Sequence, residues 1–210
     1  MYHSKNPGMP LVILNNYVGD GKSVMELVNA CGNKDFNLLC IGNLKWNHDM
    51  TPWYCPATSP VDTPCTGGAE EYLKLLLDEI LPEGLHRVSG MPSHISIAGY
   101  SLAGLFALYA AYHTDIFDRV VSISGSLWFP DFKAYVFSHI MKKKPEKVYI
   151  SLGDKESKTR NKYLQTVQEN TEQIVDHFQS KGLNVIFEMN PGNHFKDVAL
   201  RSAKGIMAII

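Results

Sequence analysis

Short apolar runs alternate with helix-like segments along almost the whole chain, and this alternation constrains the fold more than any other feature. Six runs have the length and apolar content of buried strands, at residues 11–14, 36–41, 95–98, 119–124, 148–152 and 184–188. Parallel strands need crossover connections, which are right-handed and are usually helical. The order therefore predicts an α/β fold with a mostly parallel central sheet of about six strands and helices on both faces.

Several of the helical segments carry signals for where they begin or end. A Gly-Asp-Gly turn at residues 19–21 predicts a helix near residues 23–30. Residues 69–81 have apolar side chains at helical spacing, and Pro82 is expected to stop that helix. Residues 161–181 have one apolar stripe, with Gly182 as the helix C-terminal signal. The final segment, residues 195–210, is expected to form a terminal helix.

The composition favours one domain that acts on a small molecule. Of the 210 residues, 45% are hydrophobic, which suits a single large core over residues 1–210. The 20 Lys and Arg residues nearly balance the 21 Asp and Glu residues, so no charged field favours nucleic acid or an anionic membrane. Residues 1–10 are polar, and no apolar run approaches the roughly 18 residues of a membrane span. A cytoplasmic location is expected.

The four cysteines agree with that location. Cys31 and Cys40 fall in predicted core elements, whereas Cys55 and Cys65 lie in one loop. No CxxC motif and no Cys/His metal spacing occurs, so reduced thiols are expected, with no metal site and no cofactor. A disulfide between Cys55 and Cys65 is the alternative, and it requires that the chain be exported.

The connection at residues 43–68 is long for a strand-to-helix link, and a long loop inside a compact domain usually serves a function. It contains Trp46, Trp53 and Tyr54, and Trp128 follows the strand predicted at residues 119–124. These aromatic side chains are predicted to form the walls of a substrate pocket. Packing of the same side chains against the core is the alternative.

A candidate nucleophile lies at the junction of a strand and a helix. Gly99-Tyr100-Ser101-Leu102-Ala103-Gly104 follows the strand at residues 95–98 and opens an apolar helix. The pattern is a GxSxG-type nucleophile elbow, with alanine in place of the last glycine. Small residues on both sides permit the sharp turn that would expose the Ser101 hydroxyl. Backbone N–H groups at a helix start can receive an oxyanion, so Leu102 N–H is a candidate donor.

A serine hydroxyl needs a base to accept its proton. Pro191-Gly192-Asn193-His194 follows the last predicted strand and precedes the last helix, where the base of such a fold belongs. His194 is therefore the predicted base. His48, in the long connection, is the competitor.

A base of this kind is oriented by a carboxylate, which should follow the strand at residues 148–152. Gly153-Asp154-Lys155-Glu156 offers two candidates there, and Asp131 is a third, after the preceding strand. The second half of an oxyanion hole should come from the loop after the first strand. Tyr17 N–H is the predicted donor in that loop, and the Asn16 side chain is an alternative.

With these residues placed, the chain resembles the esterase D-like family of α/β hydrolases, which includes siderophore and feruloyl esterases. The resemblance covers nearly the whole chain and rests on residues 14–17, 67–73, 79–82, 99–104, 124–128 and 193–194. It implies an α/β-hydrolase fold that lacks the usual first strands, because the chain starts at what resembles the third. Asn15-Asn16-Tyr17 stands where relatives often have His-Gly-X. Among the acid candidates, the resemblance favours Glu156.

The expected activity is carboxylic ester hydrolysis by a serine esterase, with Ser101, His194 and an acid as the catalytic groups. One alternative is an acyltransferase, since an alcohol or sugar can capture the same acyl-enzyme where water is excluded. A non-catalytic binding module on this fold is the other alternative. The sequence indicates neither the ester substrate nor the oligomeric state.

Overall fold

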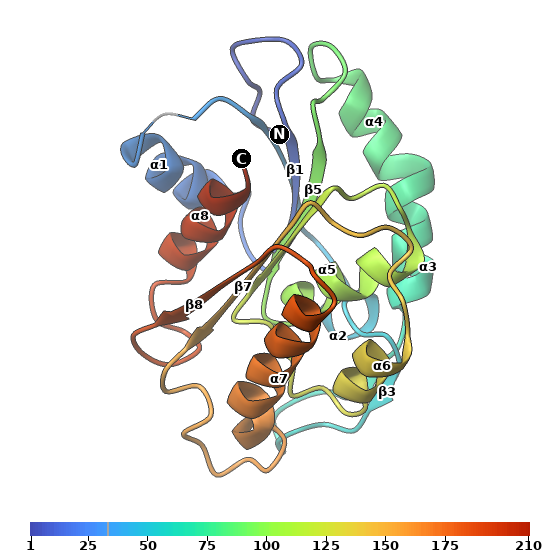
Figure 1. The fold of residues 1–210 in the computed structure, drawn as a ribbon, viewed down its shortest axis with the longest axis vertical. Helices are drawn as coiled ribbons and strands as arrows, with labels where there is room; N and C mark the ends of the chain where they lie inside the picture. Colours follow the sequence, from blue (N-terminus) through green and yellow to red (C-terminus); the bar gives the residue numbers. More distant parts are fainter. Residues whose placement is uncertain (33) are drawn as a thin grey trace.

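The computed structural model of the protein describes residues 1–32 and 34–210. Its centre is a six-stranded sheet in which every pair of neighbours is parallel (Figure 1). Across the sheet, the strands are β2 (Asn37–Ile41), β1 (Leu11–Asn15), β5 (Ile95–Tyr100), β6 (Arg119–Ile123), β7 (Lys147–Gly153) and β8 (Val185–Asn190). The predicted α/β class, with a parallel sheet of about six strands, is confirmed.

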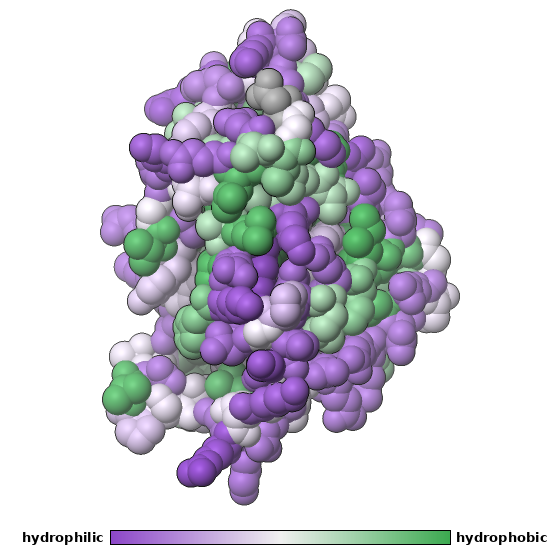
Figure 2. Space-filling view, turned by 90° about the vertical axis from the view of Figure 1, so that its left-hand side faces the viewer, coloured by the Kyte–Doolittle hydropathy of each residue, from purple (hydrophilic) through white to green (hydrophobic). Residues whose placement is uncertain are grey.

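Helices cover both faces of this sheet (Figure 1). One face carries α1 (Lys22–Ala30) and α8 (Val198–Ile209), which pack against each other. The other face carries α3 (Ala69–Leu75), η1 (Leu76–Ile80), α4 (Leu81–His86), α5 (Leu102–His113), α6 (Phe132–Ser138) and α7 (Val167–Ser180). Hydrophilic side chains cover much of the α1 and α8 side, with apolar groups between them (Figure 2).

The strand side chains divide between two cores because successive residues point to opposite faces. In β1, Leu11 and Ile13 belong to the core beneath α5, whereas Val12 and Leu14 belong to the core beneath α1 and α8. All four side chains are buried. A strand buried on both faces has no polar alternation, which explains why the sequence shows continuous apolar runs.

Helix α5 lies in the middle of the larger core. All of its residues from Leu102 to Tyr112 are buried, so it is apolar on every side. A helix of this kind is held by packing around its whole circumference. Its N-terminus, directly after β5, therefore has a well-fixed position.

The prediction that Pro82 ends its helix is wrong. The helical path continues from α3 through the π-helical turn η1 into α4, which ends at His86. Pro82 lies in the first turn of α4, where N–H groups need no partner within the helix. The π turn changes the hydrogen-bond register just before the proline, so the missing N–H is tolerated.

The helix predicted over residues 161–181 begins later than expected. A short 3-10 turn, η2 (Leu164–Thr166), leads into α7. The side chain of Asn161 accepts hydrogen bonds from the N–H groups of Tyr163 and Leu164, which favours a turn over continued helix. The other end agrees with the prediction: Gly182 has φ of +72°, and Leu183 N–H reaches the Phe178 carbonyl.

The connection at residues 43–68 contains short elements of its own. It forms the helix α2 (Trp46–Asp49) and a two-stranded antiparallel ladder of β3 (Tyr54–Cys55) and β4 (Cys65–Thr66). Cys55 and Cys65 are opposite each other in this ladder, and both are buried free thiols. Burial raises the pKa of the Cys65 thiol to about 11, so it is protonated at neutral pH.

The parallel register brings the carboxyl ends of the strands together. Gly99, at the end of β5, is aligned with Asn15 of β1 and with Ser122 of β6, and Gly153 of β7 is aligned with Asn190 of β8. The loops that follow β5, β7 and β8 therefore emerge along one edge of the sheet. In the described ranges, no helix has both the length and the apolar character needed to span a bilayer.

Candidate active site

Ser101 occupies a strained turn between β5 and α5. Its φ of 61° and ψ of −123° are unusual for a residue other than glycine. Ser101 N–H donates a hydrogen bond to the Ile123 carbonyl, and the Ser101 carbonyl accepts one from Ser126 N–H, each at 3.0 Å. The end of β6 and the segment that follows it thus hold both backbone groups of Ser101 in the sharp strand-to-helix turn that the sequence predicted.

The glycines beside Ser101 are required by close packing. A Cβ added to Gly99 would lie 2.3 Å from backbone atoms of Ala103, well inside contact distance. At Gly104 a Cβ would meet the backbone of Gly99 and Gly125 at 3.0 Å. The turn therefore excludes larger side chains at these positions, as the sequence predicted.

His194 lies within hydrogen-bond distance of Ser101. Its Nε2 atom is 3.0 Å from Ser101 Oγ, although 93 residues separate the two along the chain. The other ring nitrogen, Nδ1, is 2.7 Å from Glu156 Oε2. With Nδ1 as donor to the carboxylate, Nε2 has a free lone pair for the Ser101 hydroxyl proton. The residues predicted as nucleophile, base and favoured acid thus form one chain of contacts.

Glu156 is bound from several sides. Its side chain is only 4% exposed. Oε1 accepts hydrogen bonds from Gly153 N–H at 2.6 Å and from Arg201 Nη1 at 3.1 Å, which leaves Oε2 for His194. The carboxylate is therefore fixed in position, and its two oxygen atoms have separate partners.

These partners also determine the charge of Glu156. Burial alone raises the pKa of its carboxyl group, but the hydrogen bond and charge of His194 act in the opposite direction. Together with hydrogen bonds from Ser124 and from Gly153 N–H, they hold the pKa below its ordinary value of 4.5. Glu156 is therefore a carboxylate at neutral pH, which is the form that accepts a proton-bearing nitrogen.

The two other acid candidates are engaged elsewhere. Asp154 Oδ1 accepts a hydrogen bond of 2.6 Å from Gly192 N–H, so it ties the loop after β7 to the loop that carries His194. Asp131 has a positive φ of 63° and stands at the start of α6, where its carbonyl accepts from Tyr135 N–H. Within the part of the chain that the structure describes, neither carboxylate forms a hydrogen bond with His194.

His48, the competing base, is part of the long connection and not of this cluster. Its Nδ1 atom is 2.7 Å from Thr66 Oγ1, which joins α2 to β4. The His48 ring also packs closely against Gly68: a Cβ added to Gly68 would be only 2.3 Å from His48 Nε2. His48 therefore has a place in the packing of the connection.

The two predicted oxyanion donors belong to different segments, a helix start and a loop. Leu102 N–H is at the start of α5, and Tyr17 follows β1, with its ring packed edge-on against Trp46 at 5.0 Å. In the part of the chain that the structure describes, no backbone carbonyl accepts a hydrogen bond from Tyr17 N–H. The Asn16 amide group donates to the carbonyls of Val18 and Gly19, so that side chain is occupied within its own turn.

The four aromatic residues predicted for the pocket have different environments. Trp53 packs against Phe129, Phe132 and Tyr135, and its Nε1 donates a hydrogen bond of 2.9 Å to the Pro130 carbonyl. These contacts agree with the alternative of packing against the core.

Like Trp53, Trp46 and Trp128 are partly buried against the larger core, whereas Tyr54 is exposed. Trp128 contacts Phe129 and Tyr163, with ring centroids 5.8 and 6.5 Å away, and Trp46 packs with Tyr17. Tyr54 is 65% exposed. None of the four has a ring contact with His194, whereas Tyr100 and Phe195 do.

Three residues near the cluster were missed by the sequence analysis. Ser126 Oγ is 3.3 Å from Ser101 Oγ, and the Tyr100 hydroxyl donates to the His194 carbonyl at 2.7 Å. Arg201 is 2% exposed and contacts Glu156 from α8. One signal was available for Arg201: it lies one helical turn before Gly205, on the buried side of α8.

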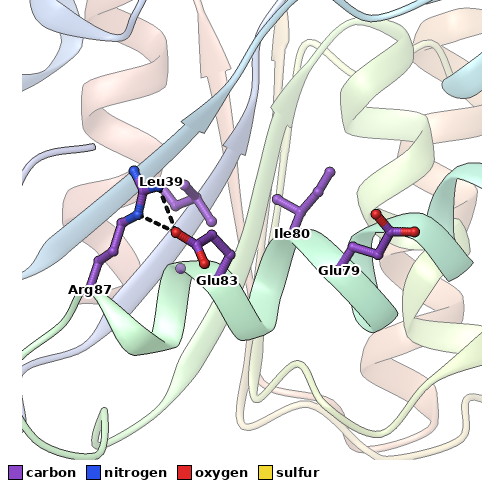
Figure 3. Close-up of a pocket in the computed structure, with 6 residues that line it drawn as sticks. Leu39, Glu79, Ile80, Glu83 and Arg87 are labelled. Carbon is purple, nitrogen blue, oxygen red and sulfur yellow. Dashed lines mark hydrogen bonds and ion pairs between the residues drawn. The ribbon is translucent and has the colours of Figure 1, made fainter.

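Two hollows on the surface of the described residues differ in their distance from this cluster. One adjoins the cluster and is lined by Asp154, Lys155, Pro191, Gly192, Asn193 and Lys196. The other lies between β2 and the helical stretch of η1 and α4, where Arg87 is hydrogen bonded to Glu83 beside Leu39 (Figure 3). The predicted catalytic residues lie near the first hollow only, because Asp154 and Gly192 belong to the loops that carry Glu156 and His194.

Solved structures share this fold. The siderophore hydrolase EstA from Aspergillus nidulans is 19% identical and superposes with a TM-score of 0.73, covering 96% of this chain and 82% of that chain. An IroE-like serine hydrolase from Shewanella oneidensis is 18% identical, with a TM-score of 0.76 over 96% of this chain and 70% of that chain. Because both structures are less than 20% identical to this chain, their similarity shows a shared fold and nothing further.

Sequence comparison extends the finding. The uncharacterized protein YbbA from Bacillus subtilis is 26% identical over 192 residues, which are 86% of this chain and 75% of that protein. The model of the family described as "Putative esterase" matches residues 42–197, a span that includes Ser101, Glu156 and His194. Because this match covers most of the chain, the protein belongs to that esterase family and has the α/β-hydrolase fold.

Proposed function

We propose that this protein is a serine esterase in which Ser101 is the nucleophile, His194 the general base and Glu156 the orienting acid. The observation that carries the proposal is the chain of contacts from Ser101 Oγ to His194 Nε2, at 3.0 Å, and from His194 Nδ1 to Glu156 Oε2, at 2.7 Å. Both distances lie within the range that proton transfer and tautomer control require. Family membership independently supports ester hydrolysis.

The first chemical step forms an acyl-enzyme. Ser101 Oγ attacks the ester carbonyl carbon while His194 Nε2 accepts the hydroxyl proton, and Glu156 stabilises the imidazolium that results. The tetrahedral intermediate then collapses, the alcohol leaves, and His194 returns the proton to the alcohol oxygen. In the second step His194 accepts a proton from a water molecule, which attacks the acyl carbon. The bond from that carbon to Ser101 Oγ then breaks, Oγ takes the proton back from His194, and the carboxylic acid is released.

The negative oxygen of each tetrahedral intermediate needs hydrogen-bond donors. The N–H groups of Leu102 and Tyr17 are the proposed pair, one at the start of α5 and one in the loop after β1. The N-terminus of α5 adds the positive end of the helix dipole at the same place. Backbone N–H groups are present whatever the side chain. The proposed oxyanion hole therefore does not depend on which side chains stand at residues 15–17, where this chain has Asn-Asn-Tyr.

Covalent labelling tests the proposal. A fluorophosphonate probe should attach to Ser101, identified by peptide mass, and Ser101→Ala should remove both the label and ester turnover. Ser126→Ala is the matched control, because Ser126 Oγ lies 3.3 Å away and is the nearest alternative hydroxyl. Labelling at Ser126, or ester turnover that survives in Ser101→Ala, would disprove the assignment.

A substrate panel then defines the ester class. p-Nitrophenyl esters of graded acyl length, feruloyl esters and acetylated sugars cover the main chemical types. Siderophore esters belong in the panel because proteins with this fold include ones named siderophore hydrolases. The same reactions repeated with an added alcohol acceptor separate hydrolysis from acyl transfer, because transfer gives a new ester instead of the free acid.

A further inference from the structure

Arg201 is a buried cation at the base of the candidate site. It lies on α8, is 2% exposed, and its guanidinium group contacts residues from four separate parts of the chain. Nη1 is 3.1 Å from Glu156 Oε1, 3.1 Å from Ser124 Oγ and 3.3 Å from the Tyr100 hydroxyl oxygen. Nη2 donates a hydrogen bond of 3.1 Å to the Pro191 carbonyl.

Each of these contacts lies beside one group of the Ser101, His194 and Glu156 cluster. Tyr100 immediately precedes Ser101, and Pro191 begins the loop that carries His194. Ser124 follows β6, whose last residue holds Ser101 N–H. The fourth contact is with the proposed acid itself. One planar group therefore joins the ends of β5, β6, β7 and β8 at the point where the cluster is assembled.

The geometry of Glu156 makes this contact specific. Arg201 and Gly153 N–H both bind Oε1, so the carboxylate is turned with Oε2 toward His194 Nδ1. An arginine is suited to this task, because its guanidinium group is rigid, always charged and donates in several fixed directions. A buried cation is costly unless paired, and in this site its counter-charge is Glu156.

We propose that Arg201 is a positioning residue for the esterase: it holds the Glu156 carboxylate in the orientation that fixes the His194 ring, and it ties the His194 loop to β5. Among the hydrogen bonds of the described residues, Arg201 has none to Ser101 or His194, so it acts through Glu156, Tyr100 and Pro191. This inference rests on the proposed function, in which Glu156 orients the base. It adds to that function a residue outside the three catalytic groups.

The test compares Arg201→Met with Glu156→Gln and with the double variant. Arg201→Met should lower kcat by about 10- to 100-fold with little change in KM, because the base is misplaced while the substrate still binds. Because Arg201 acts mainly through Glu156, the loss of kcat in the double variant should be far smaller than the product of the two single losses. Arg201→Lys keeps the positive charge but loses the planar guanidinium group with its several donors, so it should give an intermediate kcat.

Arg119→Met is the matched control. Arg119 also forms an ion pair, with Glu146 at 3.2 Å, but it lies at the opposite end of β6 from the site. It should keep the kcat of the wild type. Urea unfolding of every variant separates loss of structure from loss of turnover. If Arg201→Met does not fold, the comparison uses Arg201→Lys and the double variant instead. The double variant lacks both buried charges.

A spectroscopic readout follows the same contact without turnover. A His194 Nδ1 proton held by Glu156 gives a far-downfield proton resonance, which we expect in the wild type, in Ser101→Ala and in Arg119→Met. It should be lost in Glu156→Gln and be lost or broadened in Arg201→Met. A folded Arg201→Met variant with normal kcat and a normal resonance would overturn the inference, and so would effects of Arg201→Met and Glu156→Gln that simply multiply.

Failure of the proposed function has a different signature. In that case the wild type hydrolyses none of the esters in the panel and takes no fluorophosphonate label. The resonance measured in the same proteins still shows whether Arg201 holds Glu156 against His194. The two statements are therefore decided by separate measurements.

Discussion

The hydroxyl group of Tyr100 donates a hydrogen bond of 2.7 Å to the backbone carbonyl of His194, 94 residues later in the chain. Tyr100 is also the residue before Ser101, so this bond joins the turn of the proposed nucleophile directly to the loop of the proposed base. We predict that Tyr100→Phe lowers kcat several-fold, because the His194 loop loses one of its fixed points. The loss of stability should be about 0.5–1.5 kcal/mol, as for a typical hydrogen bond.

Tyr112→Phe is the control for this prediction. Tyr112 is also buried, and its hydroxyl group donates to the Val136 carbonyl away from the cluster. Because this bond is long, at 3.4 Å, its removal should change stability by a smaller amount, and it should leave kcat unaltered. Equal kcat values for Tyr100→Phe and the wild type would mean that the His194 loop does not depend on this bond.

Exchanging carboxylates for amides separates the acid candidates. Glu156→Gln should lower kcat by about 10²- to 10⁴-fold, because an amide cannot stabilise the imidazolium and favours the wrong ring tautomer. Asp154→Asn should remain close to the wild type, because its side-chain oxygen can still accept from Gly192 N–H. Steady-state kinetics and thermal unfolding on both variants decide the matter, and the reverse order of kcat values would make Asp154 the acid.

The pKa of Glu156 predicts how stability changes in acid. A carboxyl group whose pKa is lower in the folded protein than its ordinary value of 4.5 stabilises the fold above that pH. This contribution is lost as the pH falls from about 4.5 through the lower pKa of the folded state. The difference in unfolding free energy between the wild type and Glu156→Gln should therefore be constant near neutral pH and shrink below about pH 4.5.

Urea unfolding between pH 7 and pH 3 measures this difference. Other carboxylates with lowered pKa values, such as Asp118, remain in both proteins and cancel in the comparison. A difference that stayed constant down to pH 3 would show that the Glu156 carboxyl group is not stabilised in its charged form.

Trp53 should matter more to stability than its place in a loop suggests. Its ring lies among Phe129, Phe132 and Tyr135. Trp53 is partly buried against this core, so Trp53→Ala is expected to cost about 2–3 kcal/mol, below the range of about 3–5 kcal/mol for a fully buried aromatic group. Tyr54→Ala, at an exposed neighbouring position, should change stability by no more than about 0.5 kcal/mol. Chemical denaturation tests both, and equal midpoints would place Trp53 outside the core.

Sequence reasoning reached the fold and the three clustered residues because each depends on a local pattern. Parallel strands buried on both faces give apolar runs, and Ser101, Glu156 and His194 each follow such a run at a sheet edge. Their contacts agree with the predicted set, while their catalytic roles are proposals. The Asn16 alternative was weakened by contacts within its own turn, which spacing does not reveal.

What the sequence did not reveal depends on contacts between distant segments. Arg201 reaches Glu156, which is 45 residues away, and Tyr100, which is 101 residues away, and no short motif marks such pairs. The continuation of the helix through Pro82 was missed for another reason. It depends on a π turn at η1, which has no sequence signal comparable to that of proline.

The position of β8 in the sheet has a consequence for how the protein loses activity on heating. Within residues 1–32 and 34–210, β8 pairs with β7 alone, whereas β5, which leads to Ser101, has a neighbour on each side. An outermost strand detaches at a lower free energy than a central one. His194 follows β8, so such a detachment would separate His194 from Ser101, the proposed base and nucleophile, while most of the sheet stays intact. Turnover should then fade below the melting temperature, and amide hydrogens of β8 should exchange sooner than those of β5.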